Sequence, residues 1–134
     1  MIWLLALLAL LPLLAQGAEP QLDCEDPQYQ QEINICAARE YDEADAALNA
    51  QWDITSATMK QWDAEHGYDD GRPGYFDTLL AAQRAWIAFR DAHCASEGYL
   101  FRGGSAEPMV VSGCKAGLTR ERTLQLRALV EFDG

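Results

Sequence analysis

The stretch "LLAAQRAWIAFRDAHC", residues 79–94, decides the fold class of this chain. Its apolar side chains recur at helical spacing and form one face of a helix: Leu79, Leu80, Trp86, Ile87 and Cys94. Gln83 and Arg90 fall on that same face. A buried guanidinium is tolerated only with a hydrogen-bonded partner, so we predict that both belong to a buried polar layer that fixes helix register.

A longer helical stretch precedes this one. Asp26 is the predicted N-cap and Pro27 the first helical residue, and the helix is expected to end near Trp62. Its apolar stripe is broad: Ile33, Ala37, Tyr41, Ala44, Leu48, Trp52, Thr55, Met59 and Trp62. Glu40 lies at the edge of this stripe. Since the first two helices should be antiparallel neighbours, we predict that Glu40 meets Arg90 or Gln83 across their interface.

Glycine-bearing segments separate the helices. "HGYDDGRPGY", residues 66–75, ends the first helix, and the second is expected over residues 75–97. "GYLFRGGS" then breaks the chain again, and Ser105 is the predicted cap of a third helix that reaches about Val130. No period-two alternation indicates a strand. The expected fold is therefore an all-α, three-helix antiparallel bundle in one domain, residues 19–134.

Residues 1–18, "MIWLLALLALLPLLAQGA", carry no charged side chain and end in small residues. This pattern predicts a signal peptide, because the apolar run is too short for a comfortable membrane span and Pro12 interrupts it. The mature protein should then be periplasmic or secreted, without a membrane span.

Four cysteines follow that leader, Cys24, Cys36, Cys94 and Cys114, and none are spaced like the close pairs of a zinc site. An even number behind a signal peptide predicts two disulfides. A hairpin of the last two helices around residue 103 favours Cys94–Cys114, which leaves Cys24–Cys36. The rival pairing, Cys36–Cys94 with Cys24–Cys114, would staple all three helices and stays open at this point.

Charge is uneven along the chain, which has a net charge of −11. Most of the acidic side chains precede residue 71, and the rest of the chain is nearly balanced. A nucleic-acid partner is not expected, because phosphate binding needs a basic face. The acidic half suits a cationic protein partner or simply keeps the protein soluble.

The sequence offers no convergent catalytic constellation. Bridged cysteines leave no thiol nucleophile, and His66 and His93 lie in no hydrolase motif. The acidic segment 63–71 does not match a calcium loop, so no catalytic, metal or cofactor residue is predicted. A carboxylate-based cell-wall hydrolase remains the enzyme alternative.

Three segments carry a family resemblance: "EINICAAREYDEADAALN", "AAQRAWIAFRDAHC" and "GGSAEPMVVSGCKAGLTRERTLQL". Together with the four cysteines they resemble the LprI-type lysozyme-inhibitor domain family, from Cys24 to about Leu126. The resemblance implies a small, helical, secreted or periplasmic protein that inhibits a lysozyme by protein–protein contact. A passive envelope or accessory protein without a target enzyme is the alternative.

An inhibitor needs exposed anchors on a rigid scaffold, and Tyr and Arg are favoured for that purpose. Two loops supply such anchors at opposite ends of the expected bundle. One carries Arg72, and the other carries Tyr99, Phe101 and Arg102. We expect the second loop, residues 99–104, to make the contact with a partner protein, which the resemblance suggests is a cationic lysozyme.

Overall fold

The computed structural model describes residues 22–131, and the predicted signal peptide lies outside this range. Three long helices make up the fold, α1 (Gln30–His66), α2 (Tyr75–Gly98) and α3 (Glu107–Ala128), and a short 3-10 helix, η1 (Tyr99–Phe101), follows α2. The described residues contain no strand. The predicted all-α bundle is confirmed. None of these helices is both long enough and apolar enough to cross a membrane.

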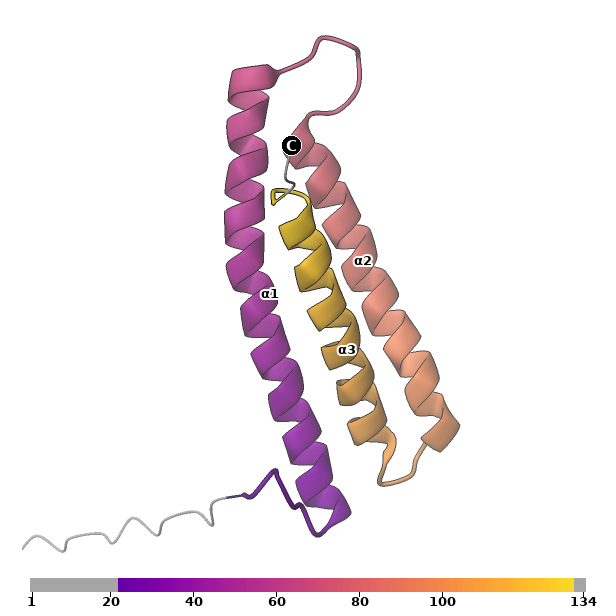
Figure 1. The fold of residues 1–134 in the computed structure, drawn as a ribbon. Coiled ribbons are helices and arrows are strands. Elements are labelled where there is room, and N and C mark those ends of the chain that lie inside the picture. Colours follow the sequence, from indigo (N-terminus) through magenta and orange to yellow (C-terminus); the bar gives the residue numbers. More distant parts are fainter. Residues whose placement is uncertain (1–21, 132–134) are drawn as a thin grey trace, which may run out of the picture.

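The third helix is the centre of the bundle. Helix α2 runs antiparallel to α1 and α3, and α3 lies between the other two (Figure 1). The most extensive helix interface joins α1 to α3, while α1 and α2 contact each other least. The expected α1–α2 neighbourhood is therefore only partly right, because α3 takes most of the apolar stripe of α1.

Helix α1 begins later than the sequence suggested. Its N-cap is Tyr29, and the Glu32 carboxylate accepts hydrogen bonds from the backbone N–H groups of Gln28 (2.7 Å) and Tyr29 (3.3 Å). This backward-reaching carboxylate satisfies donors that would otherwise be orphaned at the helix start. The predicted cap at Asp26 is wrong for that reason, since residues 26 and 27 precede the helix.

The other helix ends also show small corrections. Helix α1 continues to His66 rather than ending near Trp62, and α3 ends at Ala128 rather than Val130. Ser105 does not cap α3, whose N-cap is Ala106. The Ser105 carbonyl instead accepts a hydrogen bond from Asn34 Nδ2 (2.9 Å), which ties the α2–α3 connection to the start of α1.

Large apolar side chains gather in one half of the bundle. Leu48, Met59, Leu79 and Leu126 form the buried cluster, and partly buried residues pack against it: Trp52, Trp62, Tyr75, Phe76, Trp86 and Val130. These come from the end of α1, the start of α2 and the end of α3. The other half of the bundle carries both disulfides, which matches the general use of cross-links where a small domain has little apolar core.

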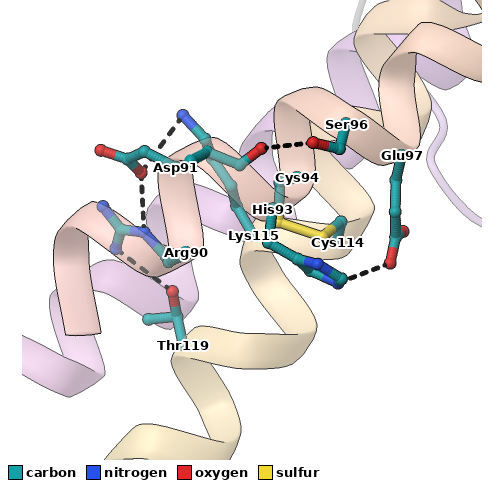
Figure 2. The surroundings of a disulfide bond; sticks show 10 residues. Arg90, Asp91, His93, Cys94, Ser96, Glu97, Cys114, Lys115 and Thr119 are labelled. Atoms are coloured by element: carbon teal, nitrogen blue, oxygen red, sulfur yellow. Dashed lines mark hydrogen bonds and ion pairs between the residues drawn. A yellow bond between two sulfur atoms is a disulfide. The ribbon is translucent and has the colours of Figure 1, made fainter. Parts of the chain in front are cut away.

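The disulfides have the preferred pairing, and the rival pairing is excluded. Cys24–Cys36 holds the segment before α1 against that helix, over a sequence separation of 12. Cys94–Cys114 joins α2 to α3 over a separation of 20, beside the His93–Glu97 ion pair (Figure 2). The Cys94 side of this bond is fully buried.

Candidate functional site

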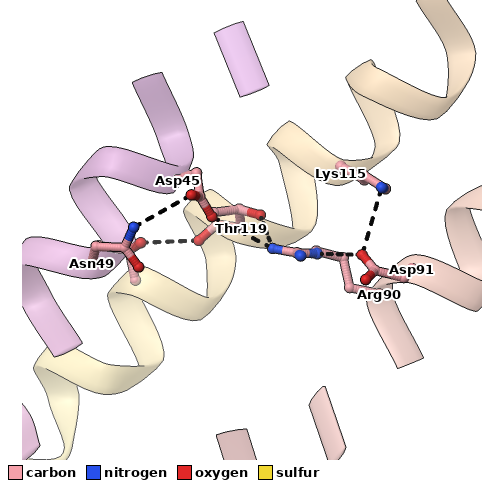
Figure 3. Close-up of polar contacts among 7 residues, drawn as sticks. Asp45, Asn49, Arg90, Asp91, Lys115 and Thr119 are labelled. Atoms are coloured by element: carbon pink, nitrogen blue, oxygen red, sulfur yellow. Dashed lines mark hydrogen bonds and ion pairs between the residues drawn. The ribbon is translucent and has the colours of Figure 1, made fainter. Parts of the chain in front are cut away.

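Arg90 is a buried cation in the middle of the bundle. Its side chain comes from α2 and is only 8% exposed. The guanidinium lies 5.0 Å from the ring centre of Trp86 and 5.4 Å from that of Tyr41, which are favourable cation–π distances. Its Nε donates to Asp91 (3.0 Å) and its Nη1 to Thr119 of α3 (3.4 Å) (Figure 3).

Helix α1 completes the surroundings of Arg90. Asp45 lies 3.8 Å from the guanidinium, and Asn49 donates a hydrogen bond to the same carboxylate (3.3 Å). Burial raises the pKa of Tyr41 above its usual value, and nearby carboxylates add to this effect while Arg90 opposes it. All three helices thus meet at the Arg90 guanidinium. That this contact fixes their register stays a prediction.

Gln83 is also buried, but it belongs to a separate contact. Its Oε1 accepts a hydrogen bond from Arg122 Nε of α3 (3.0 Å) rather than from Arg90. Gln51 of α1 makes a similar pairing nearby, because its Oε1 accepts from Arg127 (3.4 Å) and its Nε2 donates to Thr55. The buried amides therefore tie both flanking helices to α3.

The predicted role of Glu40 is wrong. Its carboxylate is 61% exposed and pairs with Arg120 of α3 at 3.4 Å. The physical reason is the position of α3: it covers the side of α1 on which Glu40 lies, so the nearest cation belongs to α3 and not to α2.

The loop of residues 67–74 carries the first candidate anchor, Arg72. Its guanidinium is already neutralised by an ion pair and a hydrogen bond with Asp70 (Nε–Oδ2, 2.7 Å). Hydrogen bonds from the side chain and backbone of Arg72 lower the pKa of Asp70. Tyr68 of the same loop is 75% exposed, but the arginine of this loop is paired with Asp70.

The second candidate anchor lies in what we call the tip, residues 99–102, at the opposite end of the bundle (Figure 1). Three apolar side chains of the tip are exposed, Tyr99 (55%), Leu100 (81%) and Phe101 (48%). The Arg102 guanidinium lies over the Tyr99 ring at 4.5 Å. No carboxylate of the described residues forms an ion pair with Arg102, so its charge is available to a partner.

Glycines and the second disulfide hold the tip in place. A Cβ at Gly98 would come within 2.5 Å of Val111 Cγ2, so only glycine lets the end of α2 approach α3 so closely. Gly103 has a φ of +77°, which favours glycine, and its N–H donates to Glu107 Oε2 (2.8 Å). The Cys94–Cys114 disulfide joins α2 to α3 about one turn before the tip and so restrains this connection.

Among the acidic groups of the described chain, Asp63 has a clear structural role. Asp63 accepts hydrogen bonds from the N–H groups of Tyr75 (2.7 Å) and Phe76 (3.0 Å), so it caps α2 from the end of α1. His93, Glu97 and Cys114 lie close enough together to suggest metal ligands, but the Cys114 sulfur is in a disulfide.

Sequence reasoning missed three residues here: Leu100, Asp63 and Arg122. Leu100 follows Tyr99 in a glycine-bounded loop, and that context signals exposure. Gly74 before α2 cannot supply a side-chain cap, which was a signal that a carboxylate from elsewhere would do so. Nothing in the local sequence of Arg122 indicated its partial burial.

Comparison with protein families gives a match that covers most of the chain. The family model for lysozyme inhibitor LprI matches residues 24–126, from the first cysteine to the last buried leucine of α3. The chain belongs to the LprI family. An uncharacterized protein of Rhizobium meliloti (strain 1021) is 45% identical to it over 118 residues, which cover 87% of this chain and 85% of the relative. No solved structure matches this LprI chain.

Proposed function

We propose that this LprI protein is a periplasmic or secreted inhibitor of a lysozyme-type muramidase, and that it acts by protein–protein contact through the tip. One observation carries the proposal: Arg102 presents an unpaired guanidinium among exposed aromatic side chains, at a helix connection close to a disulfide. The family match supports the target class.

The chemistry of the tip suits the target. Lysozyme-type enzymes cleave glycosides with a pair of carboxyl groups in a cleft, so their active site attracts a cation. An arginine can donate two parallel hydrogen bonds to a carboxylate, and neighbouring aromatic rings exclude water around it. Arg72 is less suited, because Asp70 already occupies its guanidinium.

The charge of α1 supports the encounter with a cationic enzyme. Eight acidic and only two basic side chains (Lys and Arg) lie between Gln30 and His66. Five of these carboxylates are exposed: Glu40, Asp42, Glu43, Asp53 and Glu65. Complementary charge mainly accelerates association, and salt screens it over about 10 Å at about 0.1 M.

The test is an inhibition assay with a panel of animal-type, goose-type and invertebrate-type lysozymes. We expect at least one to be inhibited, with association slowing as salt rises. Arg102→Ala should weaken inhibition about 30-fold, the effect of an interface hot spot worth about 2 kcal/mol. Arg72→Ala is the matched control, since it removes an exposed loop arginine from the other end of the bundle.

Three outcomes would contradict the proposal. If only Arg72→Ala weakens inhibition, the partner binds the other loop. If every lysozyme keeps full activity and none is retained on immobilised protein, a passive envelope or accessory role replaces the inhibitor. Release of sugars from peptidoglycan by the protein alone would favour a carboxylate-based hydrolase instead.

A further inference from the structure

A cleft of about 1000 Å³ is lined by residues at the end of the bundle opposite to the tip. The end of α1, the 67–74 loop, the start of α2 and the end of α3 surround it. Its volume is at the upper end of the usual range for small-molecule sites, about 300–1,000 Å³. The proposed inhibitor function does not use this end of the molecule, so the cleft is distinct from the proposed inhibitory surface.

Apolar side chains dominate the inside of the cleft. Met59 and Leu79, both buried, belong to the core cluster and also line the cleft, and Tyr75, Ala82 and Leu129 complete the apolar surface. Leu129 is 42% exposed, although it lies at the end of a helix whose other face packs into the core. Contact with a hydrocarbon chain would remove this apolar surface from water, which is favourable.

One cation stands in this apolar surface. Arg122 of α3 is partly buried, and its guanidinium donates to two neutral amide oxygens, Gln83 Oε1 (3.0 Å) and Gln125 Oε1 (3.1 Å). The structure gives Arg122 no carboxylate partner and its Nη2 no acceptor among residues 22–131. Burial lowers the pKa of Arg122, which reflects the loss of solvation of its charge. A partly buried cation without an anion is costly, and an anionic ligand would offset that cost.

The other charged groups of the lining leave Arg122 as the available cation. Asp63 is occupied by the N–H groups of α2, and Asp70 and Arg72 neutralise each other at the rim. Asp77 is exposed to solvent on the first turn of α2 and forms no ion pair with Arg122. The lining thus combines one unpaired inner cation with an apolar surface.

We propose that this cleft binds an amphipathic carboxylate of the fatty-acid class. The carboxylate accepts hydrogen bonds from the Arg122 guanidinium, and the hydrocarbon chain lies against Met59, Leu79 and Leu129.

Calorimetric titration of the oxidised protein with sodium dodecanoate tests this proposal, with dodecanol as the uncharged analogue. Dodecanoate should bind more tightly than dodecanol. Arg122→Gln should weaken dodecanoate binding by about tenfold or more, the usual effect of losing a hydrogen bond to a charged group, and should leave dodecanol unaffected. Arg127→Gln is the matched control, because Arg127 also comes from α3 and also donates to a glutamine, but does not line the cleft.

A second variant keeps the test decisive if Arg122→Gln does not fold. Ala82→Phe places a ring in the cleft while leaving the Arg122 hydrogen bonds intact, and it should remove binding of both probes. The proposal is overturned if millimolar dodecanoate gives no binding, or if dodecanol binds as well as dodecanoate. It is also overturned if Arg122→Gln and Arg127→Gln weaken binding equally, since that indicates only general attraction to a basic helix.

Discussion

The half-buried Asp63 carboxylate near the end of α1 should be among the most important polar groups for stability. It accepts hydrogen bonds from the first two N–H groups of α2, at 2.7 Å from Tyr75 and 3.0 Å from Phe76. Because Gly74 offers no side-chain cap, Asp63→Ala leaves both donors without a protein partner. Loss of a cap costs about 1 kcal/mol, and loss of a negative charge at a helix N-terminus costs about 0.3–1 kcal/mol more.

We therefore expect Asp63→Ala to lower the free energy of unfolding by about 2 kcal/mol. For a domain of this size, the thermal midpoint should fall by roughly 8 °C, measured by circular dichroism. Asp53→Ala is the matched control, since Asp53 is an exposed α1 carboxylate whose side chain makes no hydrogen bond in the described structure. Its effect should stay within about 0.5 kcal/mol.

Gly74→Ala perturbs the same contact from the other side. Its Cβ would lie 2.5 Å from Asp63 Oδ1, so the carboxylate must move away from the helix start. The backbone of Gly74 is in an ordinary extended conformation that alanine also adopts, so displacement of Asp63 is the main cost. The Asp63→Ala/Gly74→Ala double variant should consequently lose clearly less free energy of unfolding than the sum of the losses of the two single variants. Strictly additive losses would refute this account of the cap.

Three further predictions concern other contacts. Arg90→Met and Glu40→Leu should be additive to within about 0.5 kcal/mol in thermal melts, because Glu40 pairs with Arg120 and not with Arg90; a larger coupling would contradict the geometry. Replacing Cys94 and Cys114 together by serine should lower the free energy of unfolding by about 3 kcal/mol and weaken lysozyme inhibition. The Cys24/Cys36 double variant should lose a similar stability but keep an intact tip and its inhibition. Equal effects of the two variants on inhibition would argue against the tip as the contact site. Arg72→Ala should raise the pKa of Asp70 toward its ordinary value of 3.8, measured by NMR titration. Because folding lowers this pKa, the stabilising contact is present above the unfolded pKa and is lost as pH falls through the folded pKa. An unchanged titration midpoint of Asp70 would contradict its pairing with Arg72.

The sequence predicts much of this fold because helix-breaking residues clearly separate its helices. Glycine and proline between residues 67 and 74 stop one helix and allow the next to begin at Tyr75, as observed. The spacing of Cys94 and Cys114 around a hairpin correctly predicts their disulfide. Burial of Gln83 and Arg90 also follows from their positions on an apolar face.

Partner assignment within the bundle was less predictable. Periodicity shows which side of a helix is buried, but not which neighbour covers it, and here α3 rather than α2 covers most of α1. The sequence therefore predicts the wrong partner for Glu40. The sequence predicts too early a start for α1, because Asp26 and Pro27 are typical of a helix start whereas Glu32 supplies the capping contacts. Residue type alone predicts the tip residues as anchors, but the unpaired charge of Arg102 depends on three-dimensional packing.

The length of α2 sets a distance scale for the whole molecule. Its 24 residues, at about 1.5 Å each, separate the 67–74 loop from the tip by about 36 Å, more than the diameter of a small domain. The helix therefore works as a rigid spacer with two independent ends. An enzyme bound at residues 99–102 would leave the opposite end of the bundle uncovered. A fluorophore or an affinity handle attached near Tyr68 would therefore not obstruct the bound enzyme. The same spacing would let one molecule hold an enzyme and an acyl chain at the same time, without either occupant sensing the other through direct contact.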